Sequence, residues 1–198
     1  MLRLARVAEA PVLAEMSREL IEAGLAWRYT PRRLAALMAE RDVLVVAAEA
    51  GGVEDAEAGN DAGNEPGGAG GNAGTNQLGS RGANDRDGQA GIPQGFAVMQ
   101  FGDERAHLVL LCVHAQQQRR GLGRALHDWL LKSAQVAGMA SIALELRADN
   151  STAMAFYRSL GYREVDTVAG YYDGRIAARR MLRHLREDLA PVRGDPPR

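Results

Sequence analysis

The residues best suited to chemistry form a short loop at Gln118–Gly123, with the sequence QRRGLG, directly after an apolar run at 108–113. The apolar run has the length and the aliphatic content of a strand that is covered on both faces. After the loop, apolar residues recur at helical spacing as far as Leu130, and Gly138 stands where a helix C-cap is expected. The loop therefore joins a strand to the first turn of a helix.

A loop of this kind can bind a phosphate group. The first N–H groups of a helix have no intrahelical partner, and the helix dipole is positive at that end. The two glycines allow the backbone to come close to a ligand. Arg119, Arg120 and Arg124 add positive charge nearby. The sequence therefore predicts a site for a phosphate-bearing ligand.

Two common phosphate-binding loops do not fit this stretch. A P-loop requires Gly-Lys-Ser/Thr, and the only lysine of the chain, Lys132, falls well inside the predicted helix. A dinucleotide fingerprint requires a third glycine, where this chain has Arg124 and Ala125. Both alternatives are disfavoured.

The pattern Gln-x-x-Gly-x-Gly instead resembles the acetyl-CoA pyrophosphate loop of the GNAT superfamily of N-acetyltransferases. Residues 144–162 resemble the second half of that family's core, with a strand, an Asn-led helix that carries a tyrosine, and then Leu-Gly-aromatic. Together the two motifs cover about residues 106–165. The resemblance implies an α/β (α+β) GNAT fold: a central mixed, mostly antiparallel sheet of six to seven strands, about four flanking helices, and splayed strands at the cofactor slot.

The resemblance also implies that acetyl-CoA is the co-substrate, and it assigns the residues that would bind it. The loop would hold the pyrophosphate by its backbone N–H groups, the end of the preceding strand would pair with the pantetheine arm, and Asn150 would add a side-chain hydrogen bond. The implied cofactor-binding residues are Leu111, Cys112, Val113, Gln118, Arg119, Arg120, Gly121, Leu122, Gly123, Arg124, Asn150 and Tyr157.

Two residues match the catalytic positions of the family. Tyr157 would face the thioester sulfur as general acid, because a phenol with a pKa near 10 is protonated at neutral pH. Glu145 would take the proton from the amine, directly or through water. The alternatives are that Tyr157 belongs to the core beside Phe156 and Leu160, and that Glu145 is an ordinary solvated carboxylate on a strand.

Four aromatic residues are candidates for contact with the acceptor substrate. Trp27 and Tyr29 precede the second helix, which borders the acceptor site in the family, and they could instead anchor that connection. Tyr171 and Tyr172, expected in a loop between the last strands, resemble the paired tyrosines with which RimI-type ribosomal-protein N-terminal acetyltransferases grip a peptide; alternatively they cover the loop. The following stretch, DGRIAA at 173–178, departs from the RimI pattern because its acidic position is not reproduced.

The predicted function is acetyl transfer to a primary amine, such as a protein or peptide N-terminal α-amine, by direct attack in a ternary complex. An α-amine, with a pKa of about 7.7 to 8.0, is partly neutral without a strong base, whereas a lysine amine near 10.4 is not. Cys112 is poorly placed as an acyl carrier. One alternative is a small-molecule amine acetyltransferase that acts on an amino acid or a polyamine. Another is a non-catalytic acyl-CoA-binding module.

Composition narrows the partners and the compartment. The net charge of −1 and the apolar fraction of 46% suggest neither a nucleic-acid nor a membrane partner. Charges interrupt the N-terminal segment too often for a signal peptide, so we expect a cytoplasmic protein. The single cysteine and the four histidines show no metal-ligand spacing, so no metal is expected. A monomer and a homodimer are both compatible with the sequence.

The chain is expected to form one domain over residues 1–190, followed by a tail at 191–198. An insertion at 51–93 interrupts the domain; because residues 51–95 hold 14 of the 23 glycines, we predict a disordered hairpin insertion. Strands are expected at 2–7, 43–49, 94–101, 108–113, 141–147, 162–168 and 179–183, and helices at 9–23, 31–40, 122–137, 151–160 and in a short segment after the last strand.

Overall fold

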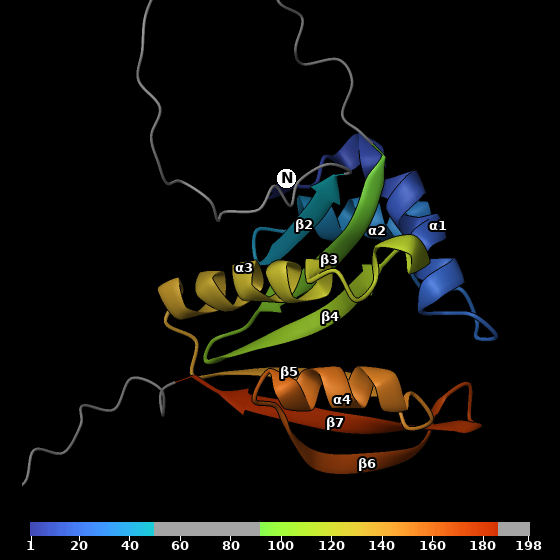
Figure 1. Cartoon of the computed structure of the whole chain (residues 1–198), viewed down its shortest axis with the longest axis vertical. Helices are drawn as coiled ribbons and strands as arrows, with labels where there is room; N and C mark the ends of the chain where they lie inside the picture. The colour runs from blue at the N-terminus through green and yellow to red at the C-terminus, as the bar shows by residue number, and fades with distance from the viewer. Residues whose placement is uncertain (50–91, 186–198) are drawn as a thin grey trace, which may run out of the picture.

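A computed structural model of the chain describes residues 1–49 and 92–185 (Figure 1). The elements in chain order are β1 (Leu2–Leu4), η1 (Val7–Glu9), α1 (Ala10–Leu20), α2 (Pro31–Ala39), β2 (Val43–Glu49), β3 (Pro93–Phe101), β4 (Arg105–Val113), η2 (Ala115–Gln117), α3 (Leu122–Val136), β5 (Ser141–Arg147), α4 (Ser151–Ser159), β6 (Arg163–Tyr172) and β7 (Ile176–His184). The strands form one seven-stranded sheet in the order β1-β2-β3-β4-β5-β7-β6. Only the β4–β5 pair is parallel in the described sheet. The predicted mixed, mostly antiparallel architecture is confirmed.

Local sequence signals set the helix starts. Helix α2 begins at Pro31, and the hydroxyl of Thr30 accepts a hydrogen bond from the Arg33 N–H at 3.4 Å. Helix α4 begins after Asn150, whose side-chain oxygen accepts from the Ala153 N–H at 2.9 Å. Such caps stabilise a helix by about 1 kcal/mol each.

Several predicted boundaries differ from the structure. The strand predicted at 2–7 ends at Leu4, because Val7 already begins the 3₁₀ helix. The helix predicted at 9–23 ends at Leu20. Tyr171 and Tyr172 lie in β6 and not in a loop, because pairing with β7 continues to Tyr172 opposite Ile176. The remaining turn is short, and it is closed by positive φ angles at Asp173 and Gly174.

Three predictions concern residues outside the described ranges. The insertion at 51–93 is described only at its last two positions, where Pro93 begins β3. The short helix expected after the last strand and the tail at 191–198 lie wholly outside the described residues.

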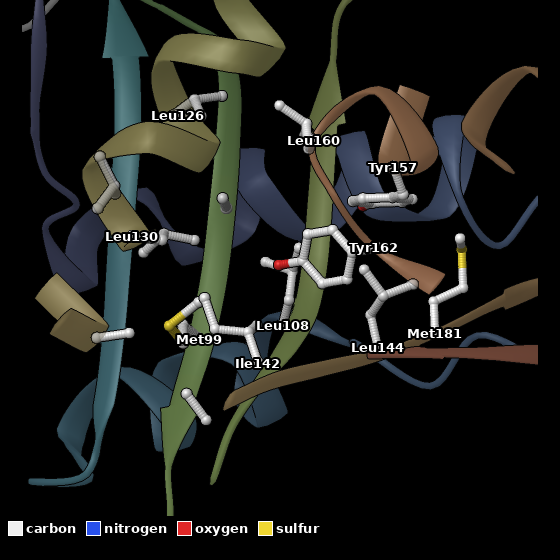
Figure 2. Packing of buried hydrophobic residues seen from close by; sticks show 14 of the residues in the cluster. Met99, Leu108, Leu126, Leu130, Ile142, Leu144, Tyr157, Leu160, Tyr162 and Met181 are labelled. Carbon is white, nitrogen blue, oxygen red and sulfur yellow. The ribbon is translucent and has the colours of Figure 1, made fainter. Parts of the chain in front are cut away.

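The four α-helices of the described residues lie two on each face of the sheet. Helices α3 and α4 share one face, and α1 and α2 lie on the other, against β2, β3 and β4 (Figure 1). The core under α3 and α4 joins the two halves of the sheet. Figure 2 shows Tyr162 in this core between Leu126 and Leu130 on one side and Tyr157 on the other. The β5–β7–β6 half therefore receives its helical cover from α4.

Strand β4 contains a bulge that exchanges its two faces. Val98 pairs with Leu110 and Met99 pairs with Leu108, which leaves Val109 as the extra residue. Before the bulge, Leu108 packs into the core under α3 and α4; after it, Leu110 and Cys112 pack into the core with α1 and α2. A regular strand would point all three even-numbered side chains to one face.

Strands β4 and β5 separate soon after they meet. Their parallel pairing covers three positions, from Arg105 opposite Ser141 to His107 opposite Ala143. Strand β5 is meanwhile paired with β7 along its whole length, from Ser141 to Arg147. The sheet is thus open between β4 and β5 beyond His107, where the sequence predicted a slot between splayed strands.

Candidate active site

A cavity of about 690 Å³ lies where β4 and β5 separate. Its wall comes from both strands, from the loop before α3, from α4 and from the ends of α1 and β6. The lining residues are Leu20, Ile21, Leu108, Val109, Leu110, Leu111, Cys112, Val113, Gln118, Arg119, Gly121, Gly123, Arg124, Leu144, Glu145, Leu146, Arg147, Asn150, Thr152, Ala153, Phe156, Tyr157 and Tyr172. The cavity therefore has a loop end, at Gln118–Arg124, and a tyrosine end, at Tyr172 and the end of α1.

The loop end presents backbone donors. The first turn of α3 closes with a hydrogen bond from the Ala125 N–H to the Gly121 carbonyl at 2.9 Å. The N–H groups of the three preceding residues therefore lie before the first hydrogen bond of the helix. Gly121 has φ +84°, and Arg119 also has a left-handed φ of 63°. The side-chain amide of Gln118 donates a hydrogen bond to the Val113 carbonyl at 3.1 Å, which links the loop to β4. Free backbone donors beside arginines can bind an anion.

Two predicted cofactor residues of the loop do not line this cavity with their side chains. Leu122 is 9% exposed and packs into the core under α3 and α4. Arg120 is exposed, and its guanidinium lies 3.4 Å from the Gln117 side-chain oxygen. Leu111, Cys112, Val113 and Asn150 all line the cavity, as do the other predicted loop residues.

Tyr157 lies in the cavity wall and in the core at once. It is 8% exposed, and its ring makes edge-to-face contacts with Phe156 and Tyr162 at centroid distances of 5.2 and 5.5 Å. Burial raises the pKa of the Tyr157 phenol well above its usual value, and the nearby Cys112 and Tyr172 raise it further. The phenol is therefore protonated throughout the neutral range, as a proton donor must be.

Cys112 is a buried thiol. Burial raises its pKa far above the usual value, so the thiolate is disfavoured at neutral pH. This environment argues against Cys112 as a covalent acyl carrier and agrees with direct transfer.

Glu145 is held in place by partners on both neighbouring strands. One carboxylate oxygen is 2.6 Å from the His107 Nε2, and the other is 3.4 Å from the Arg180 Nε. The hydrogen bond from His107 is the largest cause of a lowered Glu145 pKa. The Glu145 side chain is 18% exposed, so it is not an ordinary solvated carboxylate.

The tyrosine end gathers aromatic residues from distant parts of the chain. The rings of Tyr171 and Tyr172 meet edge to face at 5.0 Å. Burial raises the pKa of Tyr172 to about 12, and the proximity of Tyr171, Glu145 and Tyr29 adds to the shift. Tyr172 lines the cavity; Tyr29 and Tyr171 do not line it, but both are near enough to Tyr172 to raise its pKa. Three of the four predicted substrate residues are thus brought together.

Two hydrogen bonds hold the α1–α2 connection over this end. The Ala26 N–H donates to the Asp173 carboxylate at 2.9 Å, which links the connection to the β6–β7 turn. The Arg147 guanidinium donates to the Ala23 carbonyl at 3.1 Å and also pairs with Asp149. Asp173, the acidic residue after the paired tyrosines, therefore has a structural partner.

Trp27 lies apart from the other predicted substrate residues. Its ring is stacked under the Arg18 guanidinium, 4.9 Å from the ring centroid, and it lines a separate hollow with Glu15, Glu19 and Glu22. Its Nε1 is buried and lacks a hydrogen-bond partner among the described residues. The structure does not bring Trp27 to the cavity between β4 and β5.

Sequence reasoning missed several residues of the site. Leu20 and Ile21 line the tyrosine end, and Phe156 lies next to Tyr157 in the wall. Arg147 follows Glu145 by two residues and so shares its strand face, a signal that was readable in the sequence. His107 gave no such signal, because its partner is 38 residues away in the chain.

The described residues give no indication of a metal centre or of a membrane span. Within 1–49 and 92–185, no group of three or more His, Cys, Asp or Glu side chains is arranged to hold a metal ion. No helix in these ranges combines the length and the apolar character needed to cross a bilayer.

Comparisons with known proteins give one consistent result. Residues 89–181 match the acetyltransferase (GNAT) domain family. The [ribosomal protein bS18]-alanine N-acetyltransferase of Escherichia coli (strain K12) is 39% identical over 100 residues, which are 49% of this chain and 68% of that protein.

Two solved structures share the fold. The crystal structure of the ribosomal-protein-S18-alanine N-acetyltransferase from Escherichia coli superposes with a TM-score of 0.64 at 22% identity, covering 93% of this chain and 92% of that one. PaiA N-acetyltransferase from Thermoplasma acidophilum, solved in complex with coenzyme A, gives a TM-score of 0.64 at 17% identity over 93% of this chain and 98% of that one.

Proposed function

We propose that this chain, which belongs to the GNAT superfamily and is an N-acetyltransferase, transfers the acetyl group of acetyl-CoA to the α-amine of a protein or peptide. The observation that carries the proposal is the cavity between β4 and β5, which joins backbone donors at Gln118–Arg124 to Tyr172, whose ring contacts Tyr171, at its other end.

The loop end supports a phosphate-bearing donor. N–H groups at a helix start and the nearby Arg119 and Arg124 suit a pyrophosphate. Beyond His107, the β4 backbone faces a gap in the sheet and could pair with the amides of a pantetheine arm. The E. coli relative and the coenzyme A complex of a structural neighbour agree with this proposal.

The tyrosine end supports an extended acceptor with a free amine. Tyr29, Tyr171 and Tyr172 can cover the first residues of a peptide, and Glu145 lies in the wall between them and the donor end. An α-amine has a sizeable neutral fraction at neutral pH, whereas a lysine amine does not. The E. coli relative is named for an alanine acceptor in a ribosomal protein, which favours a small first side chain.

We assign two proton transfers in the reaction. The amine nitrogen attacks the thioester carbonyl, the new C–N bond forms, and its excess proton passes to Glu145, directly or through water. As the C–S bond breaks, the thiolate takes a proton from Tyr157, and the phenolate regains a proton from solvent once the products leave. Burial raises the pKa of a thiolate as it raises that of the phenol, so a raised Tyr157 pKa is compatible with this transfer.

The test is a free-thiol release assay with acetyl-CoA and matched peptides. One peptide has a free N-terminal alanine, and its control has an acetylated N-terminus and an internal lysine. Free amino acids and polyamines form the third group. We expect turnover with the free N-terminus and little with the blocked peptide.

Other results would change the proposal in defined ways. Faster turnover with amino acids or polyamines would replace the peptide acceptor with a small amine. Turnover of the blocked peptide would move the acceptor to the lysine side chain. A protein that binds acetyl-CoA in calorimetry and acetylates none of these amines would contradict the proposed acceptor class.

A further inference from the structure

We propose that His107 is a positioning residue for acetyl transfer, which fixes the carboxylate of Glu145 at the point where β4 and β5 separate. The inference rests on the role proposed above for Glu145. It assigns a function to a side chain that is not among the residues lining the cavity.

The strand register places His107 at a particular point. His107 opposite Ala143 is the last pair of the parallel β4–β5 ladder. The side chain of His107 lies on the sheet face opposite to Ala106 and Leu108, and that of Glu145 lies on the face opposite to Leu144. The two side chains therefore share a face and meet across the last paired position.

Of the two contacts that hold the Glu145 carboxylate, the one with His107 is the closer. The His107 Nε2 is 2.6 Å from one carboxylate oxygen, whereas the Arg180 Nε is 3.4 Å from the other. Arg180 also pairs with Asp166 at 3.4 Å, so its charge is shared between two carboxylates. His107 is therefore the main restraint on the carboxylate.

The carboxylate acceptor determines which ring nitrogen of His107 carries a proton. The ionised carboxylate of Glu145 can only accept hydrogen bonds, so the His107 Nε2 carries a proton in both charge states of the imidazole. The bond can persist whether His107 is neutral or charged. Its function is then geometric, since it needs no proton exchange with Glu145.

A fixed carboxylate matters because proton transfer depends on distance and angle. A base must lie within hydrogen-bond reach of the proton it removes, or reach it through one water molecule. A free glutamate side chain would sample several rotamers in the widening gap between the strands. In the reaction, the proton leaves the amine nitrogen for Glu145 and then goes to solvent, while His107 keeps its own.

The experiment compares His107→Gln with His107→Leu, each alone and combined with Glu145→Gln. The Gln side chain can place an amide N–H near the position of the imidazole Nε2, whereas Leu has no donor. The assay uses whichever amine the native protein acetylates fastest, so a wrong acceptor class would not obscure the result.

We expect His107→Leu to lower kcat about tenfold to a hundredfold and His107→Gln to lower it less than about threefold. The KM for acetyl-CoA should change in neither variant. In the Glu145→Gln background, His107→Leu should have no further effect, because there is no carboxylate left to position. Circular dichroism and thermal melting of each variant report folding separately.

Three results would overturn the proposal. Equal losses in His107→Gln and His107→Leu would show that the donated hydrogen bond is not what matters. A full additional loss in the Glu145→Gln background would show that His107 acts independently of Glu145. Native activity in Glu145→Gln would remove the role on which the inference rests, while leaving the acceptor assignment intact.

Discussion

The two ends of the cavity are built in different ways. At the loop end, the groups suited to binding are mostly backbone atoms from a single stretch, Gln118–Arg124, next to the strand that precedes it. At the tyrosine end, they are side chains from α1, from the α1–α2 connection, from β5 and from β6. A local backbone site is specified by a few neighbouring residues, whereas a site made from distant side chains depends on how the whole sheet is assembled.

This contrast separates donor from acceptor recognition. Substitutions at the loop end should change the KM for acetyl-CoA, and those at the tyrosine end should change the KM for the amine. Residues between the two ends should change kcat alone. Each of the following variants tests one of these expectations.

The largest effect is expected for Tyr157→Phe, which removes the proton donor between the two ends. The Phe ring keeps the contacts with Phe156 and Tyr162, so both KM values should stay near native. We expect kcat to fall about a hundredfold or more, as for loss of a general acid. Steady-state kinetics with both substrates measures the change.

Tyr162→Phe is the matched control, because Tyr162 is also a buried phenol and does not line the cavity. It loses only the hydrogen bond with His127. An equal loss of kcat in both variants would mean that Tyr157 acts through packing and not as an acid.

The next largest effect is expected at the loop end for Gly121→Ala. Gly121 has φ +84° and open space around a Cβ atom, so the alanine costs about 1 to 2 kcal/mol in backbone strain without a clash. If the loop shifts to relieve that strain, the KM for acetyl-CoA should rise about tenfold, with the amine KM unchanged.

Gly138→Ala provides the comparison at the opposite end of α3. Gly138 has φ +74° and equally open surroundings, so the loss of thermal stability should be similar. Its acetyl-CoA KM should be native. A raised KM in Gly138→Ala would indicate that loss of stability, and not loop geometry, explains the first result.

A smaller effect is expected at the tyrosine end for Asp173→Ala. The variant removes the acceptor of the Ala26 N–H and loosens the α1–α2 connection over the acceptor entrance. We expect the amine KM to rise about fivefold, equivalent to about 1 kcal/mol, with no change in the acetyl-CoA KM.

Asp173→Asn should behave like the native protein, because it keeps a side-chain oxygen and because Asn tolerates the φ of 51° at this position. If Asn and Ala raise the amine KM equally, the charge of Asp173 matters more than its hydrogen bond.

The smallest effect on catalysis is expected for His127→Gln, far from either end. His127 is buried on α3, its Nε2 lies 3.2 Å from the Tyr162 hydroxyl, and burial lowers its pKa. The unfolded state therefore binds a proton at a higher pH than the folded state. The stability that this neutral histidine provides is present above about pH 6.5 and is lost as the pH falls.

Urea unfolding at pH 7 and pH 5 tests whether stability falls with falling pH. The native protein should lose more stability between the two pH values than His127→Gln, while kcat and both KM values stay native. A pH dependence that is identical in the two proteins would assign the acid sensitivity to other groups.

The contrast between the two ends also explains what the sequence could predict. The loop at 118–123 and the strands at 43–49 and 141–147 depend on residues a few positions apart, and each was predicted correctly. The bonding partner of Glu145 was not predictable, because it depends on β4 being the neighbour of β5.

The direction of several side chains was also not predictable from the sequence. Trp27 and Tyr29 are two residues apart in an irregular connection, where no periodicity tells which of them lies near Tyr172. Tyr171 and Tyr172 were expected in a loop because the predicted strand ended at Val168, and the pairing that extends β6 to Tyr172 comes from β7. These positions are set by tertiary contacts and not by local propensity.

The bulge at Val109 restricts how β4 can vary among related chains. Exchange of one aliphatic residue for another on this strand alters volume only, and a core absorbs such changes at modest cost. Gain or loss of a single residue would move every side chain on one side of the bulge to the wrong face of the sheet. Strand β4 should therefore accept many substitutions over its length and very few insertions or deletions.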